Sequence, residues 1–211
     1  MKEDSQVQKL KSFKAFHVIR DPRDIIVSGY YSHLYTHSTE GWSTLEEHRK
    51  ALQDLNKDEG LLKEIEFSSY FINFLKGWNF NDERILEIKF EQLTKQPEQY
   101  IKEICKHLNI YTNKKIPLFI SLLIRYINLV LRKTKLGKIP FHVSDNYINY
   151  ICKKRSFKNM SKGRKKGDEN TNSHYRKGES GDWKNHFKQE HIDKFKELYP
   201  NLIENLGYEP F

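Results

Sequence analysis

At 211 residues the chain is long enough for one well-buried domain, and a second independent domain is not expected. A hydrophobic fraction of 37 % with 13 % aromatic residues excludes a disordered chain, and the formal net charge of +9 favours anionic partners in general. Cys105 and Cys152 lie far apart, so no disulfide framework is expected, and the nine histidines show no HxxH or HExxH spacing, which gives a zinc site little support.

The first predicted elements are a strand and a helix. The apolar run AFHVI, residues 15–19, predicts a buried strand. Asp21 and Pro22 then begin a helix that we expect to run to about residue 36, because Asp caps free backbone N–H groups and Pro suits the first helical turn. Gly29 lies inside this helix, which indicates a close approach of another segment.

Strand and helix patterns alternate further along the chain. Helices are predicted over 44–57 and 61–79, with a break at Gly60, and ILEIKFEQL at 85–93 predicts a second strand. Pro97 begins another amphipathic helix. This alternation predicts an α/β fold with a parallel sheet flanked by helices.

The second half of the chain combines helices with a long polar loop. PLFISLLIRYINLVLR, residues 117–132, is the most hydrophobic stretch, and its few polar side chains fall on one narrow helical stripe. It is short for a membrane span and predicts a helix in the core or at a partner interface; the lysines at its flanks leave peripheral membrane contact open. Helices over 145–155 and 189–199 flank residues 156–183, whose Gly, Lys, Asn and Ser content predicts a mobile loop.

Two motifs place cations where a phosphate could bind. HVIRDPRDIIVSGYYSHL, residues 17–34, puts Arg20 at the end of a strand and Ser28 eight residues later, beside the positive potential of a helix start. RKGESGDWKNHF, residues 176–187, has two adjacent cations before Gly178, and its glycines permit positive φ and expose backbone N–H groups to an anion. Taken alone, the first pattern is explained as well by Arg20 pairing with Asp21 or Asp24 while Ser28 hydrogen-bonds its own helix backbone, and the second by a solvated basic loop.

Together and in this order, the two motifs resemble those of the sulfotransferases that use 3′-phosphoadenosine 5′-phosphosulfate (PAPS). The resemblance implies that Arg20 and Ser28 bind the 3′-phosphate of the cofactor. It implies further phosphate contacts from Arg176, Lys177 and Gly178. It also implies a P-loop-NTPase-like parallel sheet, PAPS as the sulfuryl donor, no metal, and a hydroxyl or amine as the acceptor.

Two aromatic residues match the parts of the family pattern that lie near adenine. SFKNM, residues 156–160, is similar to the family segment whose Phe packs on adenine, which implies this role for Phe157. ILEIKFEQL resembles the segment that usually carries a Tyr near adenine, and Phe90 here keeps the ring and loses the hydroxyl. The resemblance covers roughly residues 15–187.

One element of the family pattern has no counterpart in the sequence. In this family a PKSGTTW-type loop cradles the 5′-phosphosulfate, and the catalytic base, usually His, lies between that loop and the Arg motif. His17, His33, His37 and His174 match no such base, so the catalytic residue stays unassigned. We therefore expect one incomplete, N-terminally truncated domain over residues 1–211, inactive or greatly weakened without the missing βα unit. An exposed sheet edge would favour a homo-oligomer or a complementing chain.

Two other classes of protein fit parts of the sequence. A basic nucleic-acid-binding module would use KKRSFKNMSKGRKK at 153–166, with Phe157 and Tyr175 stacking on bases, but no recognised nucleic-acid motif accompanies it. A kinase-like enzyme needs GxxxxGK[ST], which is absent. The expected partner is a small-molecule, carbohydrate or lipid acceptor, and the polar N-terminus, without a signal peptide, predicts a cytoplasmic protein.

Overall fold

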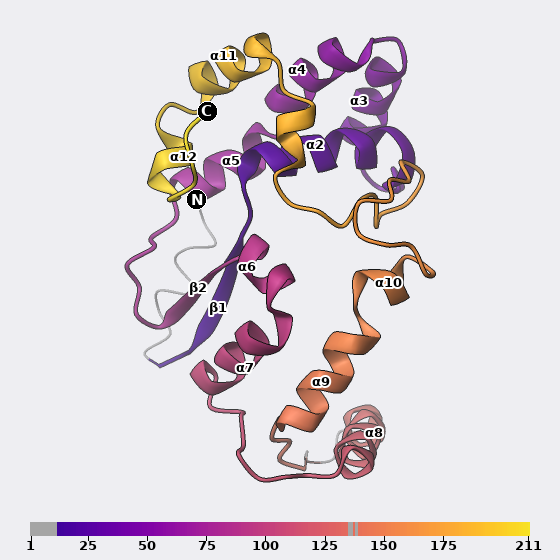
Figure 1. Ribbon diagram of the computed structural model, residues 1–211, viewed down its shortest axis with the longest axis vertical. Coiled ribbons are helices and arrows are strands. Elements are labelled where there is room, and N and C mark those ends of the chain that lie inside the picture. Colours follow the sequence, from indigo (N-terminus) through magenta and orange to yellow (C-terminus); the bar gives the residue numbers. More distant parts are fainter. Residues whose placement is uncertain (1–11, 135–136, 138) are drawn as a thin grey trace. The chain divides into compact units, whose positions relative to one another are not determined.

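The computed structural model describes residues 12–134, 137 and 139–211 (Figure 1). The chain divides into two compact units, and each is built from two separate segments. Unit 1 comprises Met1–Ile19 and Phe80–Ser156, and unit 2 comprises Arg20–Asn79 and Phe157–Phe211. Most of the polar N-terminal segment, from which a cytoplasmic protein is predicted, lies outside the described residues. A single domain over 1–211 stays a prediction.

Unit 1 contains a parallel pair of strands. β1 (Ala15–Ile19) and β2 (Ile85–Lys89) pair from Ala15 opposite Ile85 to Ile19 opposite Lys89. Across this pair, His17 Nδ1 lies 2.9 Å from Glu87 Oε2, so the strand histidine is engaged by its neighbouring strand. The parallel pairing, together with the helices, confirms the predicted α/β class; within the described residues the sheet has two strands.

The second strand is shorter than the sequence predicts. β2 ends at Lys89, and α6 (Phe90–Lys95) begins at once, so the predicted strand over 85–93 is wrong in its second half. The Thr94 hydroxyl donates to the Phe90 carbonyl at 2.9 Å within this short helix. α6 ends before Pro97, which has no N–H for a helical bond and instead begins α7 (Pro97–His107).

Helices α8 (Leu118–Thr134) and α9 (Asp145–Lys154) complete unit 1. α7 and α9 pack around a small core of Cys105, Val143, Ile148 and Cys152, all buried. Both cysteines are free thiols. They act here as small apolar side chains, and burial raises the pKa of each thiol.

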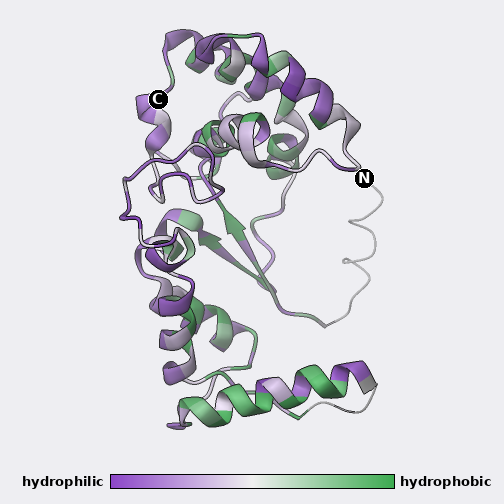
Figure 2. Cartoon of the chain, turned by 90° about the vertical axis from the view of Figure 1, so that its right-hand side faces the viewer, coloured by the Kyte–Doolittle hydropathy of each residue, from purple (hydrophilic) through white to green (hydrophobic). Residues whose placement is uncertain are grey.

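α8 leaves much of its apolar face exposed, so the prediction of a core helix is wrong, and the alternative of a partner interface stays a prediction. Part of its narrow polar stripe faces the protein: Ser121 is buried, and the Asn128 side chain forms two 2.9 Å hydrogen bonds with the backbone of Ile139. The apolar residues that run along the helix in Figure 2 include four large side chains 46 % to 69 % exposed: Phe119, Leu123, Tyr126 and Val130. In the part of the chain that the structure describes, no helix is long and apolar enough to cross a membrane.

Unit 2 is helical. It contains α2 (Pro22–Tyr31), the π-helical turn η1 (Ser32–Thr36), α3 (Ser43–Gln53), α4 (Lys57–Phe67), α5 (Ser69–Lys76), α10 (Phe157–Met160), the 3₁₀ turn η2 (Asp182–Asn185), α11 (Gln189–Leu198) and α12 (Leu202–Asn205). The predicted helix over 22–36 therefore changes to π geometry in its last five residues. The core includes fully buried side chains from four helices, Ile26, Leu45, Leu61, Ile65 and Phe195. Each contributes about 1.5–3 kcal/mol by leaving water.

Two glycines let α2 and α4 approach closely. A Cβ on Gly29 would lie 2.7 Å from Glu64 Oε1, which confirms the close approach predicted at this position. A Cβ on Gly60 would lie 2.6 Å from the Tyr30 ring. Gly60 is therefore a packing residue inside α4, and the predicted helix break at this position is wrong.

Candidate phosphate-binding site

The start of α2 is organised by an ion pair between two of its own residues. Asp21 caps the helix by accepting a hydrogen bond from the Arg23 backbone N–H at 3.0 Å. The Arg23 guanidinium returns to the same carboxylate with Nε to Oδ1 at 2.9 Å and Nη2 to Oδ2 at 2.7 Å, and both side chains are buried. Arg23 Cζ also lies 3.9 Å from the centre of the Trp183 ring. The helix start is thus ion-paired, but through Arg23 and Asp21, whereas the alternative for the first motif paired Arg20 with Asp21 or Asp24.

Asp24 joins the two motifs across 157 residues of sequence. Its buried carboxylate accepts hydrogen bonds from the backbone N–H of Gly181 at 2.6 Å and of Trp183 at 3.0 Å. Burial raises the pKa of Asp24 above its usual range, although these two bonds and the charge of Arg20 oppose that effect. The positive charge of Arg20 therefore favours the ionised form of the Asp24 carboxylate. Ser28 follows Asp24 by one helical turn, on the same face of α2.

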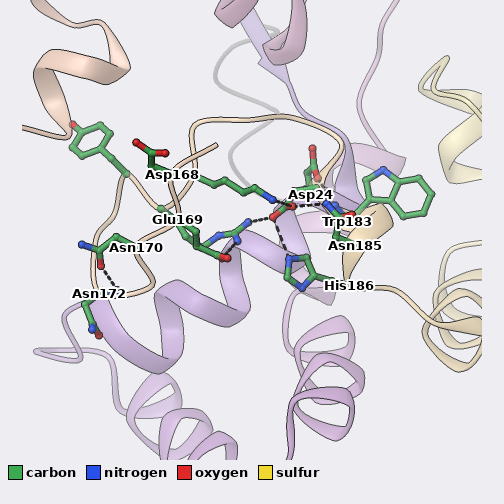
Figure 3. A network of polar contacts seen from close by, with 12 residues as sticks. Asp24, Asp168, Glu169, Asn170, Asn172, Trp183, Asn185 and His186 are labelled. Atoms are coloured by element: carbon green, nitrogen blue, oxygen red, sulfur yellow. Dashed lines mark hydrogen bonds and ion pairs between the residues drawn. The ribbon is translucent and has the colours of Figure 1, made fainter. Parts of the chain in front are cut away.

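Asp182 holds the two adjacent cations of the second motif. It is buried, and Lys177 Nζ donates to its Oδ1 at 2.6 Å, while Arg176 donates to its Oδ2. Asn185 Nδ2 donates to Oδ1 at 2.9 Å, and His186 Nε2 lies 3.1 Å from Oδ2 (Figure 3). Burial alone would raise the pKa of Asp182, but the hydrogen bonds from Lys177, Asn185 and Arg176 outweigh it and hold this pKa well below its usual range.

Arg176 has two further neighbours. Its guanidinium pairs with the Glu169 carboxylate, and its Cζ lies 4.6 Å from the centre of the Tyr31 ring. Burial lowers the pKa of Arg176, but Asp182 and Glu169 raise it by more, so the guanidinium stays charged. Burial raises the pKa of Tyr31 to about 12, which keeps its hydroxyl protonated. Arg176 is thus a fixed positive charge on one side of the site.

Gly178 lies directly against Phe157. Its φ is +73°, and an added Cβ would come within 2.4 Å of the Phe157 ring, so both the backbone and the contact require glycine. Arg164 Cζ lies 5.4 Å from the centre of the same ring. The aromatic residue assigned to adenine and the glycine assigned to phosphate are therefore neighbours in space.

The segment predicted to be a mobile loop is a loop held by hydrogen bonds. Arg164 Nη1 donates to the carbonyls of Asp168 and Arg176, each at 2.8 Å. Its Nη2 donates to Ser173 Oγ at 3.1 Å and to the Tyr175 carbonyl. Two backbone hydrogen bonds, from Gly167 N–H to the Lys177 carbonyl and from Asn170 N–H to the Arg176 carbonyl, each at 2.9 Å, join the two sides of the same loop.

All six residues assigned to the cofactor from sequence lie in unit 2: Arg20, Ser28, Phe157, Arg176, Lys177 and Gly178. Contacts bring Phe157 to Gly178 and place Arg176 and Lys177 on one carboxylate. Phe90 lies in unit 1 at the start of α6. The sequence offered Asp24 only as an alternative ion-pair partner of Arg20, and it did not single out Asp182, Glu169 or Arg164, although Asp182 stands inside the GDW stretch of the second motif.

Comparison with known proteins identifies the family. The sulfotransferase domain family matches residues 5–207, and the chain belongs to it. Human sulfotransferase 2A1 is 22 % identical over 204 residues, which cover 94 % of this chain and 59 % of that protein. The guinea-pig 3-beta-hydroxysteroid sulfotransferase is 24 % identical, with coverage of 93 % and 58 %.

A solved structure is also similar to the chain. The crystal structure of mouse sulfotransferase SULT7A1 complexed with PAP is 20 % identical, covers 91 % of this chain and 58 % of that chain, and has a TM-score of 0.45. The present chain thus spans about three-fifths of the length of these relatives.

Proposed function

We propose that the chain binds PAPS, and its desulfated product 3′-phosphoadenosine 5′-phosphate (PAP), in unit 2 as part of a sulfuryl-transferring enzyme. The observation that supports this most is Asp24, which ties the helix of the first motif to the Gly181–Trp183 backbone of the second. The proposed ligands of the phosphates are Arg20, Ser28, Arg176, Lys177 and Gly178, with Phe157 against the adenine.

The charges of the site suit an incoming phosphate. Asp182 is buried and holds Arg176 and Lys177 in place through its two oxygens. The other carboxylate on Arg176, that of Glu169, belongs to a side chain that is 39 % exposed. A phosphate can therefore displace Glu169 from Arg176 while the Asp182 contacts persist. The guanidinium fork matches phosphate oxygens geometrically, and its charge strengthens each hydrogen bond.

In the proposed reaction, the sulfuryl group passes in line from PAPS to an acceptor oxygen or nitrogen. The bond between sulfur and the phosphate oxygen breaks, a bond from sulfur to the acceptor forms, and a base takes the acceptor proton. Positioning and charge stabilisation carry most of such transfers, as in phosphoryl chemistry. The residues of this site hold the donor at its 3′-phosphate and adenine.

Two finer parts of the proposal concern turnover and the acceptor. The 211 residues contain no PKSGTTW-type loop, so we expect transfer by this chain alone to be weak or absent. A small hydroxylated molecule is the proposed acceptor class, supported by a relative named for a 3-beta-hydroxysteroid.

Calorimetric titration with PAP tests the binding site. Arg176→Ala should weaken PAP binding by about 10- to 150-fold, the range for a lost hydrogen-bonded contact to a charged group. Lys184→Ala is the matched control, because Lys184 belongs to the same motif and its side chain is 62 % exposed. Adenosine 5′-phosphate, which lacks the 3′-phosphate, should bind more weakly than PAP.

Two results would count against the proposal. One is a folded protein that shows neither heat of binding nor thermal protection at millimolar PAP. The other is salt-sensitive binding of an oligonucleotide that PAP does not displace, which would indicate a basic nucleic-acid-binding module.

A further inference from the structure

A second polar cluster lies in unit 2 and has no part in the proposed cofactor site. It consists of His33 in η1, His48 in α3 and Glu64 in α4. His33 Nδ1 lies 3.1 Å and His48 Nε2 lies 2.8 Å from the same oxygen, Glu64 Oε2. The side chains of His48 and Glu64 are 3 % and 0 % exposed, and that of His33 is 12 % exposed.

The local structure around the cluster brings these residues together. Gly29 leaves room for the Glu64 carboxylate against α2, because any Cβ there would overlap Oε1. The π-helical turn that carries His33 inserts one extra residue per turn, and such turns are frequent at functional sites. The spacing along the chain is 15 and then 16 residues, which no short metal motif describes.

The three facing atoms match the donor set of a zinc site. Two imidazole nitrogens and one carboxylate oxygen are a known set of protein ligands for tetrahedral zinc, in which water or another ligand takes the fourth position. Bonds of about 2.0–2.2 Å place tetrahedral ligand atoms about 3.3–3.5 Å apart, a few tenths of an ångström wider than the two N–O separations here. The three ligand atoms all lie within 4.8 Å of one another.

The residues around the cluster fix its orientation. Ser68 Oγ donates to Glu64 Oε1 at 2.9 Å, an oxygen that also lies 3.0 Å from His33 Nδ1, whereas His48 Nε2 contacts Oε2. The Phe67 ring stacks on His48 with centres 3.8 Å apart, and Trp42 meets His33 edge-on at 6.0 Å. A hydrogen-bonded ligand carboxylate within an aromatic shell is typical of the surroundings that tune metal sites.

A further histidine, His37, lies beside the cluster. His37 has an exposed side chain, and its ring lies 5.8 Å from that of His33. A water molecule or the His37 imidazole could fill a fourth position there.

Two other groups of histidine and carboxylate residues in the described chain are already engaged. In the first, Asp58 pairs with Lys188, and both ring nitrogens of His191 have backbone partners, the Lys188 N–H and the Asp58 carbonyl. In the second, Glu169 and Asp182 pair with Arg176. The His33–His48–Glu64 cluster differs from both, because no Lys or Arg among the described residues pairs with its carboxylate.

We propose that His33, His48 and Glu64 bind one divalent transition-metal ion, with Zn²⁺ as the ion that this donor set fits best. The ion bonds to His33 Nδ1, His48 Nε2 and Glu64 Oε2. Each histidine binds as a neutral ring with its one N–H on the other nitrogen, so a doubly protonated ring releases one proton to solvent on binding. It links η1, α3 and α4, and so supports α2, whose Gly29 packs on the same carboxylate.

The test measures metal content and affinity in the whole chain. Protein loaded with Zn²⁺ and then dialysed should retain about one ion per chain by elemental analysis, and Co²⁺ should give the intense visible bands of a tetrahedral site. His48→Gln and Glu64→Gln should lose the ion, whereas His142→Gln, at an exposed histidine of unit 1, should keep it. Ser68→Ala should weaken binding about 10- to 100-fold through the freed carboxylate.

Titration of the wild-type chain against a chromogenic chelator does not depend on whether a variant folds. Competition with the chelator for one equivalent of Zn²⁺ supports the site. Absence of competition, or a stoichiometry that His48→Gln and Glu64→Gln leave unchanged in folded protein, overturns it. If the wild-type chain does not compete with the chelator, the cluster is a hydrogen-bonded network without a metal ion.

Discussion

Gly178→Ala adds one methyl group at the contact between the two parts of the proposed cofactor site. The new Cβ would lie 2.4 Å from Cδ2 and 2.6 Å from Cε2 of Phe157, far inside van der Waals contact. Either the ring or the loop must move. Because Phe157 is the proposed adenine contact and Gly178 a proposed phosphate contact, moving either one should weaken PAP binding.

Two energies add at this position. Holding an alanine at φ +73° costs about 1–2 kcal/mol, because the left-handed region crowds Cβ. Relieving the overlap with the ring costs about 1–3 kcal/mol more, the usual range for overpacking. Gly41→Ala separates the two, since Gly41 has the same φ of +73° and nothing within 4 Å of its added Cβ.

The assay is calorimetric titration of both variants with PAP, with urea unfolding as the stability measurement. Gly178→Ala should bind PAP about 5- to 150-fold more weakly, the factor that corresponds to 1–3 kcal/mol, and Gly41→Ala should bind it as the wild type does. If folded Gly178→Ala binds PAP within twofold of the wild type, the Phe157–Gly178 contact is not part of the cofactor site.

Three further predictions concern charge, pH and packing. Glu169→Gln should tighten PAP binding by about 1.5- to 5-fold in calorimetry, because a partly exposed carboxylate no longer competes for Arg176. The pKa of Asp182 is lower in the folded than in the unfolded chain, so its ionised carboxylate stabilises the fold at any pH above its unfolded pKa of about 4. The urea-derived free energy of unfolding should therefore fall as the pH drops from about 4 towards the folded pKa, and Asp182→Asn should make that fall less steep. Gly29→Ala should lower the free energy of unfolding by about 1–3 kcal/mol, because its Cβ would overlap the buried Glu64 carboxylate.

Each of these predictions has a control and a contradicting result. Glu40→Gln changes an exposed carboxylate elsewhere in unit 2; equal effects of Glu40→Gln and Glu169→Gln on PAP would point to net charge alone. An unchanged acid slope in Asp182→Asn would assign the pH dependence to other carboxylates. Gly77→Ala, whose added Cβ would be 3.9 Å from its nearest atoms, should be nearly neutral, and equal losses in Gly77→Ala and Gly29→Ala would refute the overlap with Glu64.

Helix starts that depend only on neighbouring residues in the sequence were predictable. Asp21 and Pro22 begin α2 as predicted, and Pro97 begins α7, because capping and the missing proline N–H act within one turn. The Gly60 prediction failed because the residue that makes glycine necessary there, Tyr30, belongs to another helix.

The orientation of α8 shows a different limit of sequence patterns. A narrow polar stripe on an apolar helix is compatible with burial of either face, and hydropathy does not distinguish the two. The hydrogen bonds between Asn128 and Ile139 decide the orientation in this chain, and they depend on a segment eleven residues away that has no periodicity of its own.

The amino-acid sequence by itself determined the family motifs and six candidate cofactor ligands, because each motif is a continuous run whose chemistry is local. The tertiary structure decided how they are held: Asp24 bonds to a backbone 157 residues away, and Asp182 fixes the two cations. It also decided the grouping of His33, His48 and Glu64, which only the packing of separate helices brings together. Contacts between distant segments depend on how helices pack, and a linear pattern does not carry that information.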